Sequence, residues 1–220
     1  MTASRLSSKS EMERSMPACL SGLEHISRFW DKRHNMFSAK ILPGEYYVSM
    51  HGELISTVLG SCISACIRDV KMGIGGMNHF MLPMGCEEEH AGKIHLTSAT
   101  RYGNFAMEML INEILKAGGN RKNLEVKLFG GGRVLSSMTK MDIGNKNINF
   151  IHGYLKEENL KITSEDTGDI YPRKVLFFAD TGKVRVKKLH NIHNDTINKR
   201  EDTYRKSIDK KAVQSDIELF

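Results

Sequence analysis

Hydrophobic and polar positions alternate most clearly between residues 60 and 67. Apolar side chains at every second position would point to one face of a strand and small polar side chains to the other; the first set is Ile63, Ala65 and Ile67, and the second is Cys62, Ser64 and Cys66. Residues 69–73 supply a turn, and residues 74–82 are predicted to return as a strand that stops at Pro83. The pattern therefore predicts a β-hairpin.

Two later segments show the 3.6-residue period of amphipathic helices. The first is capped by Thr97 or Ser98 and ends at Gly118–Gly119, and the second covers about residues 147–158. Further strands are predicted at residues 45–50, 54–59, 124–129, 160–164, 174–178 and 183–189. Because several strands precede the first helix and the two types mix afterwards, the order favours an α+β (mixed α/β) domain over a strict βαβ array.

The two ends of the chain differ from its middle. Residues 1–40 are predicted to be an N-terminal extension, partly flexible, and its apolar residues at helical spacing predict a short amphipathic helix; they are Leu20, Leu23, Ile26 and Trp30. Residues 41–189 are predicted to form the main domain, and residues 190–220 a charged C-terminal tail. We interpret this basic tail as solvated, or as a weak docking segment for an acidic partner.

Composition limits the classes of function. The 220 residues are 40% hydrophobic and 26% charged, which suits one soluble domain with tails. The formal net charge of +6 is not accompanied by an RNP motif, a helix-turn-helix pattern or zinc-finger spacing, so nucleic acid is not an expected partner. No apolar run approaches the ~20 residues of a membrane span, and residues 1–17 lack a secretion signal. We therefore expect a cytoplasmic protein without membrane insertion.

Cys62 and His79 are the candidate catalytic pair. A hairpin centred between Val70 and Lys71 would place them directly opposite one another, with Cβ atoms about 4.5–5.5 Å apart. A slip of one residue would instead put them on opposite faces of the sheet. In the aligned register a thiol lies beside an imidazole, which stabilises the thiolate and produces the nucleophile of a cysteine hydrolase.

The residues around Cys62 support this chemistry. Gly60 permits a tight backbone before the thiol, and backbone N–H groups there could form an oxyanion hole. Ser56 and Thr57 lie just upstream, and either hydroxyl could orient the imidazole of His79. The glycines at 130–132 lack the pattern of a phosphate-binding loop, so we interpret them as a turn or as a place where substrate backbone passes closely.

Two alternatives apply to the same side chains. A strand cysteine and a strand histidine are often structural residues, and we interpret Cys66 as part of the core. The second alternative is a zinc site whose candidate ligands are Cys62, Cys66, Cys86, His90 and His95. Because Cys62 and Cys66 could chelate together only from a helix or a sharp turn, the alternation argues against zinc. We therefore expect neither a metal nor another cofactor.

Several ordered motifs resemble CheD, the family of bacterial chemoreceptor glutamine deamidases. They include Thr57-Val-Leu-Gly-Ser-Cys62, Gly75-Gly-Met-Asn-His-Phe-Met-Leu-Pro83, Ile41-Leu-Pro-Gly-Glu-Tyr-Tyr-Val48 and the segment Lys127–Gly132. The resemblance covers roughly residues 25 to 189 and implies that Cys62 is the nucleophile and His79 the general base and acid. In some members the third residue is a threonine six positions before the cysteine. This chain has Ser56 there, so we name Ser56 first and Thr57 as its rival.

The resemblance also implies a fold, a reaction and partners. The fold would have layered mixed β-sheets with flanking helices, as in the cytotoxic necrotizing factor-type cysteine deamidases, with residues 41–189 as the catalytic domain. The enzyme would convert specific glutamines of methyl-accepting chemotaxis receptors to glutamate through a thioester, releasing ammonia. Its partners would be the cytoplasmic domains of these receptors and, in many bacteria, a CheC-type phosphatase. As an alternative, the chain is a chemotaxis regulatory binding module that acts mainly through that phosphatase.

Overall fold

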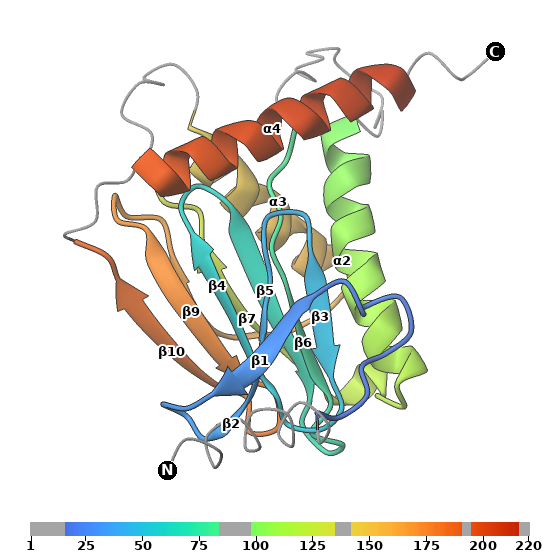
Figure 1. Cartoon of the computed structure of the whole chain (residues 1–220). Helices are drawn as coiled ribbons and strands as arrows, with labels where there is room; N and C mark the ends of the chain where they lie inside the picture. The colour runs from blue at the N-terminus through green and yellow to red at the C-terminus, as the bar shows by residue number, and fades with distance from the viewer. Residues whose placement is uncertain (1–15, 84–97, 135–141, 191–194, 216–220) are drawn as a thin grey trace, which may run out of the picture.

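Two five-stranded β-sheets form the framework of the protein (Figure 1). The computed structural model describes residues 16–83, 98–134, 142–190 and 195–215. The first sheet has the order β1 (Ser27–Asp31), β2 (Met36–Lys40), β4 (Leu54–Leu59), β9 (Arg173–Phe178) and β10 (Lys183–Lys188). The second sheet has the order β3 (Tyr46–Ser49), β6 (Gly75–Asn78), β5 (Ile63–Asp69), β7 (Leu124–Gly130) and β8 (Ile162–Thr167).

Both sheets are mixed. Strand β2 runs parallel to β4 and strand β7 parallel to β8, whereas the other neighbouring strands are antiparallel. The described helices are α2 (Ser98–Lys116), α3 (Ile143–Glu157) and α4 (Asp195–Ser215), with a short 3₁₀ turn η1 (Arg121–Asn123) before β7. The predicted α+β class with mixed sheets and flanking helices is confirmed.

Strand β5 is buried on both faces, and this divides the core in two. Ile63, Ala65 and Ile67 face helices α2 and α3, where they join an apolar cluster with side chains such as Leu110 and Ile151. Cys62 and Cys66 face the opposite way, into a second cluster between the sheets that includes Ile55, Val175 and Phe177. The alternation in the sequence is therefore confirmed, and it directs both thiols toward the space between the sheets.

The prediction of an amphipathic helix near the N-terminus is wrong. Residues 27–31 form strand β1, which pairs with β2, and β2 in turn pairs with β4. Leu23 and Ile26 precede the strand in turns, where each packs into the core between the sheets. An apolar spacing of three residues fits a helix but also fits consecutive turns, and here tertiary packing decided between them. Residues 27–40, predicted as part of an extension, thus contribute two strands to the first sheet.

The helices differ from the prediction in extent. Helix α2 begins at Ser98, and the chain leaves it through Gly118, which has a φ of +104°. Helix α3 begins at Ile143 rather than at residue 147, because the Asp142 side chain caps it by accepting a hydrogen bond from the Asn145 N–H. None of the helices in the described segments has the length and apolar composition needed to cross a membrane.

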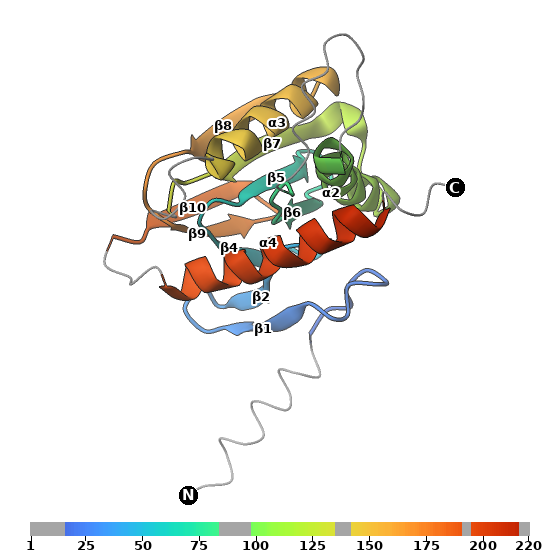
Figure 2. The same ribbon diagram turned by 90° about the horizontal axis from the view of Figure 1, so that it is seen from above.

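The segment predicted as a charged tail contains helix α4. This helix lies across the end of the sheets where β4 finishes and β5 begins, and the view from above shows it beside α2 (Figure 2). Most of its described side chains are exposed or half-buried, whereas three are buried: Ile197, Glu201 and Ile208. The position of α4 matters because the loop beneath it carries the candidate nucleophile.

Candidate active site

Cys62 lies in a short loop between β4 and β5 that the three glycines hold in place. The N–H of Gly131 donates to the carbonyl of Cys62 at 2.7 Å, and the N–H of Gly132 donates to the carbonyl of Gly60 at 2.8 Å. A Cβ atom at Gly130 would lie 2.2 Å from the Cys62 carbonyl oxygen, and its φ of +112° also favours glycine. The close approach expected at these glycines is therefore made by the protein's own backbone.

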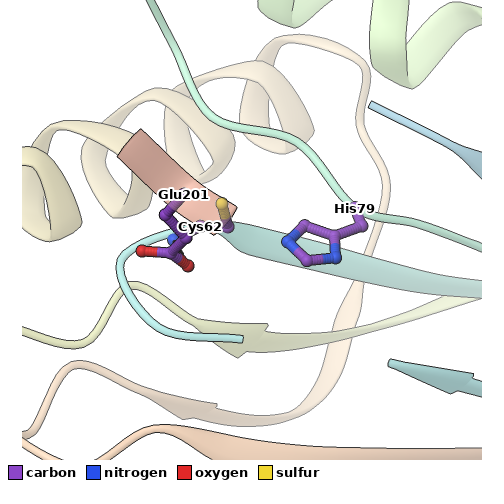
Figure 3. A group of neighbouring side chains, drawn as sticks. All are labelled: Cys62, His79 and Glu201. Carbon is purple, nitrogen blue, oxygen red and sulfur yellow. Dashed lines mark hydrogen bonds between the residues drawn. The ribbon is translucent and has the colours of Figure 1, made fainter. Parts of the chain in front are cut away.

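His79 follows β6, and its backbone is fixed by the segment before β3. Its N–H donates to the Glu45 carbonyl at 2.9 Å, and its own carbonyl accepts from the Gly44 N–H at 2.7 Å. The imidazole is 1% exposed and the Cys62 side chain is fully buried. One atom of each of Cys62, His79 and Glu201 lies within 4.8 Å of the others: the sulfur, a ring nitrogen and a carboxylate oxygen. Figure 3 shows a ring nitrogen of His79 directed toward Cys62.

The predicted hairpin register is wrong, although Cys62 and His79 still lie close together. Cys66 pairs with Met77 and Ile63 bridges to Phe80, so Cys62 does not lie directly opposite His79. The turn is longer than assumed, because the Asp69 carboxylate accepts the N–H groups of two turn residues, Lys71 and Met72, and Gly73 has a φ of +69°. The register is displaced by an even number of residues, so both side chains keep the same face and meet diagonally.

Thr57, and not Ser56, is the hydroxyl that contacts the imidazole. Thr57 Oγ1 lies 2.8 Å from His79 Nδ1 and donates its own hydrogen to the Ile41 carbonyl at 2.9 Å. Since the hydroxyl donates elsewhere, it accepts from Nδ1–H, which leaves the lone pair of neutral His79 on Nε2. Ser56 points to the other face of β4, where its hydroxyl donates to the Ala39 carbonyl. Naming Ser56 ahead of Thr57 is therefore corrected by the geometry.

The Cys62 loop forms a nest of backbone N–H groups, and the Glu201 carboxylate occupies it. One oxygen accepts from the N–H groups of Gly60 at 2.8 Å and Cys62 at 3.3 Å. The other accepts from the N–H and the hydroxyl of Ser61, at 2.9 and 2.7 Å. Glu201 is 2% exposed and reaches this loop from α4 (Figure 3). These donors can stabilise negative charge beside the Cys62 sulfur, as an oxyanion hole requires.

Sequence reasoning missed Glu201. It is one of several charged residues in a segment that was interpreted as a solvated tail, and its neighbours Arg200 and Asp202 are charged as well. The apolar residues Ile197 and Ile208 flank it at helical spacing, and with Glu201 they would lie on one helix face. That spacing was the only local signal that the segment packs against something.

Sequence reasoning also missed Asn147, a fully buried residue of α3 that links the segments carrying Cys62 and His79. Its side-chain N–H donates to the Ser61 carbonyl at 2.8 Å, and its side-chain oxygen accepts from the Leu82 N–H at 2.9 Å. One amide therefore holds the loop before Cys62 and the segment after His79 at a fixed separation. The sequence predicts only the start of a helix at this residue and no role for its side chain.

The surroundings of the candidate pair favour the uncharged form of both side chains. Burial, together with the positive charge of Arg200, lowers the pKa of His79 to about 3. Burial and the neighbouring Glu201 carboxylate raise the pKa of the Cys62 thiol well above its usual range. The closed site therefore favours neutral thiol and neutral imidazole, which differs from the stabilised thiolate that the sequence predicted.

Comparison with known proteins identifies the family. A family model described as CheD chemotactic sensory transduction matches residues 81–188. A protein of Halorhodospira halophila named probable chemoreceptor glutamine deamidase CheD is 52% identical over 206 residues, which are 93% of this chain and 94% of that protein. The chain belongs to the CheD family. Another CheD, from Hahella chejuensis, is 49% identical over 205 residues, or 93% of this chain and 95% of its own.

Two of the five candidate zinc ligands of this CheD-family chain, Cys62 and Cys66, lie in the part that the structure describes. Cys86, His90 and His95 lie outside the described residues. Cys66 is buried in the core, where burial raises the pKa of its thiol. The donor atoms of Cys62, His79 and Glu201 are close enough to share an ion. However, both carboxylate oxygens already accept hydrogen bonds from the nest, so the arrangement satisfies Glu201 as an anion.

Proposed function

We propose that this CheD-family chain deamidates glutamine side chains of chemoreceptors to glutamate, with Cys62 as nucleophile. The observation that carries the proposal is the convergence of three groups on the Cys62 sulfur: the imidazole of His79, the N–H nest of residues 60–62 and a carboxylate already bound there. The relatives are named probable chemoreceptor glutamine deamidases, which supports this substrate.

The first half of the reaction forms a thioester. His79 Nε2 takes the proton of the Cys62 thiol, and the sulfur attacks the carboxamide carbon of the glutamine. The developing oxyanion accepts hydrogen bonds from the backbone N–H groups of residues 60–62. The imidazolium then gives its proton to the nitrogen, the carbon–nitrogen bond breaks, and ammonia leaves.

The second half hydrolyses the thioester. Neutral His79 removes a proton from water, and the resulting hydroxide attacks the thioester carbon. The carbon–sulfur bond breaks, Cys62 recovers its proton from the imidazolium, and the glutamic acid product loses its own proton to solvent to become the carboxylate. Thr57 is a positioning residue in both halves, because its hydroxyl keeps the Nδ1 proton in place and so leaves Nε2 available to the thiol.

The experiment that tests the proposal uses a receptor cytoplasmic fragment containing candidate glutamines. The purified chain should convert amide to acid, seen as the mass increase that accompanies replacement of –NH₂ by –OH, with release of ammonia. Cys62→Ala should abolish this conversion, and Cys66→Ala, which removes a second buried thiol outside the site, should preserve it. Conversion by the Cys62→Ala variant would contradict the mechanism.

Two finer expectations belong to the same proposal. A CheC-type phosphatase as partner, with a mainly regulatory role for the chain, stays a prediction from the family resemblance. It would be tested by co-purification of the two chains, and by normal chemotaxis in a Cys62→Ala strain if regulation dominates. The cytoplasm is the proposed compartment, because the proposed substrate glutamines belong to the cytoplasmic domains of the receptors.

A further inference from the structure

The Glu201 carboxylate occupies the N–H groups that the proposed mechanism assigns to the oxyanion. It is the same chemical group as a newly formed glutamate side chain, and it accepts four hydrogen bonds from the loop that carries the nucleophile. The Cys62 sulfur lies within 4.8 Å of a Glu201 carboxylate oxygen. The nest is therefore filled by a group of the chain itself.

Helix α4 is also attached through apolar side chains, since Tyr204 packs against the core between the sheets. Among its described side chains Ile197, Glu201 and Ile208 are buried, and they form one narrow stripe. The Tyr204 hydroxyl adds a hydrogen bond to the Tyr102 hydroxyl of α2. A carboxylate is costly to bury unless donors satisfy it, so the N–H nest is what makes this position favourable for Glu201. At the loop that carries Cys62, the helix is thus held by a group that a glutamate product could replace.

The closed position of α4 is incompatible with turnover. Cys62 is fully buried and His79 is 1% exposed, so a glutamine side chain of another protein cannot reach the sulfur. The N–H groups that would stabilise its oxyanion are already bonded to Glu201. Substrate binding therefore requires Glu201 to leave the nest, and with it at least the middle of α4.

We propose that α4 is a lid whose Glu201 carboxylate imitates the product, and that it keeps the active site closed until a substrate segment displaces it. The proposal rests on the function proposed above for Cys62. The competing role for Glu201 is a structural clamp that keeps the Cys62 loop in its catalytic shape. The two roles predict effects of opposite sign when Glu201 is removed, because a clamp supports catalysis and a product analogue opposes it.

The first test measures alkylation of Cys62 by iodoacetamide in the native full-length chain, with peptide mapping to separate it from the other cysteines. A lid closed more than about 90% of the time reduces access about tenfold, so Glu201→Ala should raise the alkylation rate by about tenfold or more. Asp202→Ala is the matched control, since this neighbouring carboxylate faces Arg205 on the same helix and should leave the rate unchanged. A rate that does not rise in Glu201→Ala overturns the proposal.

A second variant separates displacement of the helix from the loss of one charge near the thiol. Ile208→Asp removes a buried apolar contact of α4 but keeps Glu201, and it should also raise the alkylation rate. If only Glu201→Ala reacts faster, the carboxylate acts on the thiol directly and α4 is not a lid. Circular dichroism and thermal unfolding of each variant would establish that the remaining fold is intact.

The second test measures deamidation of the receptor fragment. Both Glu201→Ala and Ile208→Asp should show a faster initial rate than the wild-type chain, whereas a structural clamp predicts a slower one. Faster alkylation without deamidation by any variant would contradict the proposed function but leave α4 as a lid. Slower deamidation together with unchanged alkylation would overturn the lid.

Discussion

Cys62 and Cys66 are two thiols close together in the sequence, yet they differ in the groups that lie beside them. Both are buried, both face the core between the sheets, and burial raises the pKa of each thiol. Cys66 lies in the middle of β5 and pairs with Met77 on one side and Lys127 on the other. Cys62 lies just before β5 begins, with His79 and the N–H nest beside it.

The difference shows that burial and residue type do not identify a nucleophile. Strand β5 is paired on both sides at Cys66, so the backbone donors of that region are used in the sheet. Where the chain leaves β4 and has not yet entered β5, the donors of residues 60–62 can point at a ligand instead. The proposed nucleophile therefore lies where the pairing between the strands ends.

The largest effects should come from replacing each thiol with a hydroxyl. Cys62→Ser should reduce deamidation by at least about 10³-fold with little loss of stability, because a neutral serine is a poor nucleophile here. Cys66→Ser should retain activity but lower the free energy of unfolding by about 1–3 kcal/mol, because it buries a hydroxyl in apolar surroundings. Mass spectrometry and urea unfolding would measure the two effects; equal losses of activity would remove the distinction between the cysteines.

A second comparison concerns the adjacent hydroxyls on β4. Thr57→Val keeps the shape of the side chain but removes the acceptor of His79 Nδ1–H, so kcat should fall on the order of 10²-fold. Ser56→Ala should change kcat little, because its hydroxyl contacts only the Ala39 carbonyl among the described groups. A larger loss in Ser56→Ala than in Thr57→Val would return the positioning role to Ser56.

Asn147→Ala should show that the position of the Cys62 loop depends on a side chain of helix α3. The change leaves the Ser61 carbonyl and the Leu82 N–H without their partner, so the free energy of unfolding should fall by about 1–3 kcal/mol and kcat should fall with it. Asn145→Ala on the exposed side of the same helix is the control. Alkylation of Cys62 should accelerate, whereas that of Cys66 should not, because the sheet itself holds Cys66.

The smallest effect concerns pH. The pKa of His79 is lowered from 6.5 to about 3, so between these values the unfolded chain binds a proton that the folded chain does not. Keeping His79 neutral therefore does not reduce the free energy of unfolding above about pH 6.5, and reduces it progressively as pH falls toward about 3. Urea unfolding at several pH values should show a shallower decline for His79→Gln than for the wild type. Cys66→Ser should keep the wild-type slope.

Sequence reasoning succeeded where the signal is local. The alternation at residues 63–67 fixes which side chains share a face, and the long amphipathic segment at residues 98–116 has only one regular structure that buries its apolar side. It failed where one spacing of apolar residues fits two structures, as before and within β1, where turns and a strand formed in place of the predicted helix. It also failed where turn length decides, since the bonds of Asp69 to the turn backbone displaced the register from the one assumed.

By itself, the sequence determined which side chains of residues 62–67 share a face, and its motifs predicted the family to which the chain belongs. Only the tertiary structure decided that Thr57 holds the imidazole, that Asn147 joins the two segments of the site and that Glu201 fills the nest. The physical reason is distance along the chain. Alternation acts between neighbouring residues, whereas the Glu201 bonds join positions about 140 residues apart and follow from packing alone.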